Sequence, residues 1–150
     1  MAPTPGEAMH RRLMQSAAVL LLGLAMAAQA AGPGRGQLNK LTQAQDAYVA
    51  AVRWSDFETA EGFIDPAYRQ AHPLTDLERE RYRQVQVSSY RERSRGAGAD
   101  GTIERRVEMG VVNRNTLAER TVTVTERWRW DAEAKRWWQV QGLPDLWQGQ

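Results

Sequence analysis

Apolar residues recur at two different spacings along this chain. Between residues 41 and 54 they recur every three or four positions, which is the spacing of one face of a helix. In the second half of the chain they alternate with polar residues, which is the spacing of a strand that is covered on one side. The change of period predicts an α+β fold, in which N-terminal helices pack on an antiparallel sheet of about four strands.

Capping signals predict where the helices begin and end. Residues 42–45, Thr-Gln-Ala-Gln, fit a capping box, so a first helix is expected over residues 42–54. Asp56 is a good N-cap for a second, shorter helix, which should end at Asp65 because a residue before proline is pushed out of the helical region. Another capping box opens a short helix over residues 75–82.

Strict alternation predicts the strands, and runs rich in glycine or polar residues predict the turns between them. The strands are expected over residues 85–93, 103–111, 121–130 and 137–140. For the last hairpin we favour pairing Trp130 with Trp138, which keeps apolar side chains on one face. A one-residue slip would pair Trp130 with Trp137 and send Trp138 to the other face. In the favoured register Trp137 lies on the polar face, near Arg127 or Arg129.

The first thirty residues have the pattern of a signal peptide. Arg11 and Arg12 precede an apolar run over residues 13–27, and Ala-Gln-Ala at 28–30 supplies the small residues of a cleavage site. The run is shorter than the roughly 20 residues that span a bilayer, so we expect release rather than anchoring. The paired arginines leave the twin-arginine route open, although their neighbours favour the general secretory route.

This leader sets the expected organisation of the chain. Residues 1–30 are predicted to form a cleavable signal peptide, residues 31–38 a glycine-rich flexible linker, and residues 39–150 a single α+β domain. The protein is therefore expected in the periplasm or outside the cell, with no membrane contact after cleavage.

Composition removes several classes of function. The chain has no cysteine, which excludes disulfides and a lipoprotein anchor. Its 20 Lys and Arg residues against 18 Asp and Glu are interleaved, so no unbalanced basic patch points to a nucleic-acid partner. His72 is the single histidine after the predicted leader, which argues against a zinc site of the usual ligand type. No cofactor is expected.

Four segments carry a family resemblance. They are residues 54–60 (Trp-Ser-Asp-Phe-Glu-Thr-Ala), 63–69 (Phe-Ile-Asp-Pro-Ala-Tyr-Arg), 126–131 (Glu-Arg-Trp-Arg-Trp-Asp) and 136–140 (Arg-Trp-Trp-Gln-Val). Over roughly residues 40–147 the chain resembles the nuclear transport factor 2-like superfamily, also called ketosteroid-isomerase-like. The resemblance implies a cone, with helices packed into a curved sheet and a pocket that can open between them. Because this superfamily hosts isomerases, dehydratases and secretion-system components, it leaves the function open.

The superfamily's isomerase-type chemistry needs an Asp base in an apolar pocket and a Tyr or protonated acid as hydrogen-bond donor. By residue type, the candidates for such a pocket are Tyr48, Asp56, Asp65, Tyr68 and Tyr90. Helix capping and a turn before proline account fully for Asp56 and Asp65, so no catalytic residue is assigned.

The six tryptophans are the remaining signal. Those expected in the core are Trp54, Trp128, Trp130 and Trp138. Trp137 and Trp147 are harder to bury, and exposed aromatic residues beside arginines suit a contact with another protein. The expected interface consists of Arg127, Arg129, Trp137 and Trp147.

Two functions remain as hypotheses, beside a purely structural role in the cell envelope that shares the sequence features of the first. The favoured one is an exported binding module that self-associates or binds a periplasmic protein through the outer face of its sheet. The alternative is a small-molecule-binding protein, or a cofactor-free enzyme, with a pocket between helices and sheet. An apolar cavity with an inward-facing carboxylate near a Tyr hydroxyl would favour the alternative.

Overall fold

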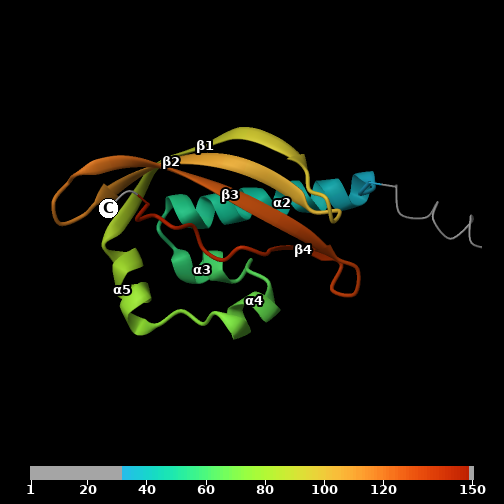
Figure 1. Cartoon of the computed structure of the whole chain (residues 1–150), viewed down its shortest axis with the longest axis horizontal. Coiled ribbons are helices and arrows are strands. Elements are labelled where there is room, and N and C mark those ends of the chain that lie inside the picture. The colour runs from blue at the N-terminus through green and yellow to red at the C-terminus, as the bar shows by residue number, and fades with distance from the viewer. Residues whose placement is uncertain (1–31, 149–150) are drawn as a thin grey trace, which may run out of the picture. The chain divides into compact units, whose positions relative to one another are not determined.

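The computed structural model describes residues 32–148, and a compact unit begins at Arg35. Its helices are α2 (Arg35–Arg53), α3 (Phe57–Glu61), α4 (Pro66–Ala71) and α5 (Asp76–Arg83). Its strands are β1 (Val85–Ala97), β2 (Ile103–Asn113), β3 (Glu119–Asp131) and β4 (Arg136–Gln139), which lie in the sheet in chain order, each antiparallel to the next. The prediction of N-terminal helices packed against a four-stranded antiparallel sheet is confirmed (Figure 1). The predicted signal peptide lies outside the described residues.

Helix α2 begins seven residues before the predicted start, so residues 35–38 are helical and were wrongly predicted as linker. Thr42 does not cap the helix, because its hydroxyl donates to the carbonyl of Leu38 within the helix at 3.2 Å. The first turn is fixed by a tertiary contact instead, in which the indole Nε1 of Trp137 donates to the carbonyl of Gln37 at 2.7 Å. This contact outweighs the low helix propensity of Gly36.

The C-terminal end of α2 is a Schellman motif. The amide of Ser55 donates to the carbonyl of Val52, and the amide of Asp56 donates to the carbonyl of Ala51. Ser55 occupies the position after the cap with a φ of 58°, a left-handed conformation that favours glycine. Its buried hydroxyl oxygen has no hydrogen-bond partner among the described residues.

The shorter helices begin at local signals. Asp56 caps α3 and accepts from the amide of Thr59 at 3.0 Å, as predicted. The capping box of Thr75 and Glu78 opens α5, also as predicted. The sequence prediction misses helix α4, because it places the end of a helix at Asp65 and Pro66. Asp65 is instead the N-cap of α4, and proline suits the first position of a helix because its missing N–H would have no partner there.

Strand β1 contains two irregularities that change which residues face the helices. The pairing with β2 shifts between Val87 and Ser89 and again between Glu92 and Ser94. Each bulge adds one residue and so reverses the alternation of faces. Val87, Tyr90, Glu92 and Arg95 therefore share one face, although strict alternation would place Tyr90 and Glu92 on the opposite face. The strand also runs to Ala97, through residues that were predicted to form a turn.

The favoured register of the last hairpin is wrong, and the slipped alternative is present. Trp130 pairs with Trp137, and Arg129 pairs with Trp138. Trp137 is 1% exposed, because it points toward α2 and not to the polar face. Trp138 lies on the opposite face, where the Arg136 guanidinium covers its ring at 3.8 Å. The tryptophan that lies beside an arginine on the polar face is therefore Trp138 and not Trp137.

Beyond β4 the sheet edge is covered by the segment between α3 and α4. The amide of Gln139 donates to the carbonyl of Phe63 at 2.9 Å, and the amide of Asp65 donates to the carbonyl of Gln139 at 2.8 Å. Ile64 and Gln139 form a parallel bridge. Covering an edge in this way prevents its pairing with another chain.

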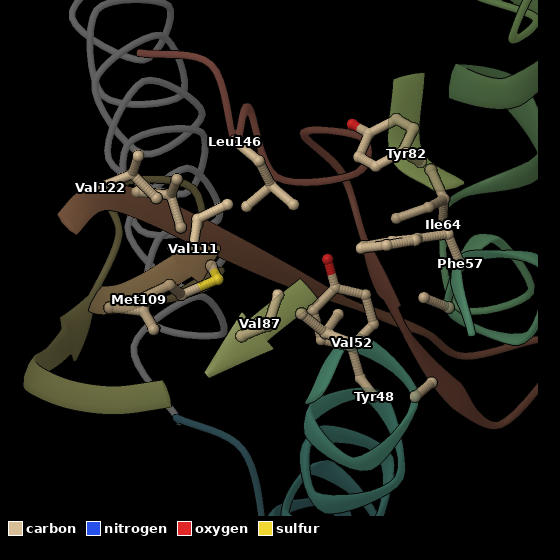
Figure 2. Packing of buried hydrophobic residues seen from close by; sticks show 14 of the residues in the cluster. Tyr48, Val52, Phe57, Ile64, Tyr82, Val87, Met109, Val111, Val122 and Leu146 are labelled. Atoms are coloured by element: carbon tan, nitrogen blue, oxygen red, sulfur yellow. The ribbon is translucent and has the colours of Figure 1, made fainter. Parts of the chain in front are cut away.

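The apolar core lies between α2, the sheet and the C-terminal segment. Figure 2 shows side chains of α2 (Tyr48, Val52), of the sheet (Met109, Val111) and of the C-terminal segment (Leu146) directed into one region. The rings of Tyr48 and Trp128, both fully buried, meet edge-to-face at 5.5 Å.

Trp54 was predicted in the core but is 85% exposed. It follows the last residue of α2 and lies off the buried helix face, which runs through Tyr48, Ala51 and Val52. The helical spacing itself therefore excludes Trp54 from the core.

Replacement of Ser55 by glycine should stabilise the protein. A left-handed conformation costs a non-glycine residue about 1–2 kcal/mol, and the extra freedom of glycine in the unfolded chain costs about 0.5–1 kcal/mol. We expect Ser55→Gly to raise the free energy of unfolding by about 0.5 kcal/mol, and Ser55→Val to lower it, both measured by urea denaturation. A glycine variant less stable than the wild type would contradict this account of the turn.

Candidate functional site

A row of charged side chains crosses the helix-covered face of the sheet. Arg95, Arg105 and Glu126 lie opposite one another on β1, β2 and β3. Arg105 and Glu126 are 4% and 1% exposed, and the Nε of Arg105 lies 2.6 Å from the Oε2 of Glu126. Removing two charges from water costs several kcal/mol for each ion, so such a pair must be fully hydrogen-bonded to be tolerated.

Three side chains hold the carboxylate of Glu126. Besides Arg105, the Tyr90 hydroxyl donates to its Oε1, and the indole Nε1 of Trp128 donates to its Oε2 at 3.2 Å. The Nη2 of Arg105 also donates to the Tyr90 hydroxyl at 2.8 Å, which closes a ring of hydrogen bonds. Burial, and then the charge of Glu126, raise the pKa of Tyr90 far above its usual value, so Tyr90 acts as a neutral donor.

Charged residues of β1 connect this ring to the surface and to α2. Glu92 accepts from the guanidinium of Arg95 at 2.9 Å, and its carboxylate lies 3.6 Å from Arg105. These contacts keep the pKa of Glu92 below its usual value despite partial burial, and the hydrogen bond with Arg95 has the largest effect. Arg95 also donates to the Oε1 of Gln45 on α2 at 2.9 Å. The two acidic and two basic side chains of this cluster thus balance one another in charge. It is called here the Glu126 cluster and consists of Gln45, Tyr48, Tyr90, Glu92, Arg95, Arg105, Glu126 and Trp128.

Two buried polar atoms of α2 have no hydrogen-bond partner among the described residues. They are the Nε2 of Gln45 and the hydroxyl of Tyr48. Figure 2 shows the Tyr48 ring directed away from α2 into the interior. Burial, and then the charge of Glu126, raise the pKa of Tyr48 well above its usual value. An unsatisfied buried donor costs about 1–3 kcal/mol, so these two atoms mark where a polar ligand group would be stabilised.

The structure brings together two of the five predicted pocket residues. Tyr48 and Tyr90 both lie near Glu126, whose carboxylate affects the pKa of each. The inward-facing carboxylate is therefore Glu126, and neither Asp56 nor Asp65 supplies it. Asp56 caps α3, and the hydroxyl and amide of Thr59 lower its pKa.

Asp65 and Tyr68 belong to α4, away from the Glu126 cluster. Asp65 caps this helix through the amide of Ala67 at 2.8 Å and pairs with Arg129. Burial alone would raise the pKa of Asp65, but these contacts lower it below the usual value. The Tyr68 ring lies against the His72 ring, with centroids 4.6 Å apart.

The predicted interface residues do not form one exposed surface. Trp137 is buried, as described above, which corrects its predicted exposure. Arg127 pairs with Glu104 at 2.7 Å, and Arg129 pairs with Asp65. Trp147 is half-buried, with the guanidinium of Arg81 over its ring at 4.4 Å.

A surface groove of about 460 Å³ lies between α2 and the start of β1. It is lined by Asp46, Val49, Ala50, Arg53, Trp54, Gln86, Val87 and Ser88, and is called here the α2 groove. Trp54, with most of its surface exposed, is the largest side chain on its rim. The sequence prediction missed this groove because Trp54 was placed in the core.

The described residues offer no metal centre, since no group of three or more His, Cys, Asp or Glu is placed to hold an ion. Over the same residues, none of the helices is long and apolar enough to cross a membrane. Comparison with known proteins assigns no family, because no family model, no curated protein and no solved structure matches the chain. The α+β fold class is thus established, and the superfamily resemblance stays a prediction.

Replacing Glu126 should destabilise the protein strongly. Glu126→Gln leaves the buried guanidinium of Arg105 without its nearest counter-charge, so we expect the free energy of unfolding to fall by roughly 3 kcal/mol. Glu108→Gln is a matched control, because Glu108 pairs with Arg93 at the surface and its loss should cost less than about 1 kcal/mol. Urea denaturation measures both, and equal small losses would show that the buried pair contributes little.

Proposed function

We propose that this protein is an exported binding module of the nuclear transport factor 2-like superfamily, which acts by contact with another protein. Export is supported by the signal-peptide pattern of residues 1–30, which implies a periplasmic or secreted protein. Membership of the superfamily is supported by the four sequence segments that carry the resemblance and by the α+β arrangement of helices on one antiparallel sheet. The contact surface is the α2 groove.

The observation that carries the proposal is the exposure of Trp54 beside the α2 groove. A tryptophan side chain buries about 150–250 Å² in an interface, which at about 25 cal/mol per Å² corresponds to about 4–6 kcal/mol before the cost of ordering. Tryptophan is also among the residues that contribute most to protein–protein binding. Val49, Ala50 and Val87 give the groove an apolar floor of the kind such a side chain contacts.

The outer face of the sheet supports binding less well than the sequence suggested. Arg127 and Arg129 already pair with acidic residues of this chain. Trp137, which was to be the aromatic anchor there, is buried. We therefore assign the contact to the α2 groove.

Photo-crosslinking in the cells that produce the protein tests the proposal. With benzoylphenylalanine at position 54 of the full chain, irradiation should give a covalent adduct of higher mass, because this position touches the bound protein. The same residue at position 133, exposed in the turn between β3 and β4, should give none. Absence of an adduct at position 54, or equal adducts at both positions, would overturn the proposal.

A small-molecule-binding role, with or without cofactor-free catalysis, is the second candidate. It is favoured by the unpartnered Nε2 of Gln45 and hydroxyl of Tyr48 beside an inward-facing carboxylate. Against a catalytic role, Arg105, Tyr90 and Trp128 already hold that carboxylate, so it is not placed to accept a substrate proton.

Native mass spectrometry of the protein, as purified from the producing cells, distinguishes the second candidate. A bound small molecule that is lost in Tyr48→Phe is the result this role predicts, because the variant removes only the hydroxyl. A bare chain mass in the wild type would contradict it. Circular dichroism of the variant checks that the fold is kept.

A further inference from the structure

We propose that the protein bound at the α2 groove is a second copy of this chain, held by an antiparallel contact between the two α2 helices. This inference rests on the proposed function and names its partner. It is carried by three features of α2: the pattern of exposed residues, the placement of two charges, and the position of Trp54.

The outward face of α2 is suited to close contact with another helix. Gln43, Asp46, Ala47, Ala50 and Arg53 are all exposed and recur at helical spacing. The two alanines at the centre of this stripe allow a second helix to approach closely, while the polar residues lie toward its ends.

Two opposite charges stand on this face, too far apart to satisfy one another. Asp46 and Arg53 are seven residues apart, which is about 10.5 Å along a helix. Both line the α2 groove, and no ion pair within the described part of the chain includes either of them. Within the described residues, Asp46 has only a longer-range interaction with Arg95, which is already paired with Glu92, and Arg53 is in no ion pair.

A two-fold axis supplies those opposite charges. When two α2 helices cross antiparallel with the axis between Val49 and Ala50, Asp46 of each copy lies opposite Arg53 of the other. One acid and one base placed evenly about the axis make the surface self-complementary, which is the requirement of a symmetric dimer.

The same register gives Trp54 a place to bind. Position 54 of one copy lies opposite position 45 of the other, next to Asp46 at the far end of the second α2 groove. The indole ring of each copy can therefore cover part of the groove of its neighbour. Both exposed tryptophans are buried by one contact, which accounts for their exposure in the single chain.

A charge-swap series tests this arrangement. The protein, purified as cells expressing the full chain produce it, is examined by sedimentation equilibrium. We expect a dimer for the wild type. For Asp46→Arg and for Arg53→Asp we expect the dissociation constant of the dimer to rise at least about tenfold, because each variant places like charges opposite one another. The double variant Asp46→Arg with Arg53→Asp restores the attraction and should restore the dimer.

Two control variants separate this contact from general effects of charge and fold. Glu133→Arg makes the same change of charge as Asp46→Arg at an exposed turn, and it should leave the dimer intact. Trp54→Ala should weaken the dimer without altering net charge. Thermal unfolding followed by circular dichroism confirms that each variant is folded.

Three results would overturn the proposal: a wild type that is monomeric at the highest soluble concentration, a dimer that survives both single swaps, or a double swap that fails to recover it. These results differ from a failure of the proposed function. A monomeric chain that still forms an adduct at position 54 binds a different protein, whereas a chain that forms no adduct there binds none at this groove.

Discussion

The buried ion pair between Arg105 and Glu126 constrains the rest of the structure. Its two charges are tolerated in the interior only because each is hydrogen-bonded, and the required donors come from β1, β2 and β3 together. A one-residue slip of any of these strands would turn a charged side chain to the other face and leave its partner buried and unpaired. Pairing of the buried charges therefore requires one particular register of the sheet, which includes the bulges of β1. The bulges in β1 are the element that brings Tyr90 and Glu92 to this face.

This constraint also shapes the helical layer. Gln45 and Tyr48 place α2 over the Glu126 cluster, and Trp137 fixes its first turn through the carbonyl of Gln37. With one face of α2 held against the sheet, its opposite face and the final Trp54 are left toward solvent. The buried carboxylate is already held by three donors, whereas the α2 groove carries an exposed indole and two charged side chains that form no ion pair within the described residues. For this reason binding at the surface is the function that the geometry supports best.

Local signals allowed part of this fold to be predicted from the sequence. The cap at Asp56 and the capping box at Thr75 were correct, because a cap depends on residues within one turn. The start of α4 was missed, since a proline marks the first turn of a helix as readily as the residue after its end. The bulges of β1 and the register of Trp137 were not predictable from alternation, because contacts distant in sequence decide both.

Of the site, Tyr48 and Tyr90 were named by residue type, but Glu126 and Arg105 were overlooked. Their signal was present, since each occupies an inward position of a strand face whose other residues are mostly apolar.

The most direct test of the central claim is a double-mutant cycle on the buried pair. Urea denaturation of Arg105→Met, of Glu126→Leu and of the double variant gives the coupling free energy between the two side chains. If the pair determines the register of the sheet and the interior, the double variant loses far less stability than the sum of the single variants, with a coupling of about 2–3 kcal/mol. Losses that simply add, with a coupling near zero, would contradict the account.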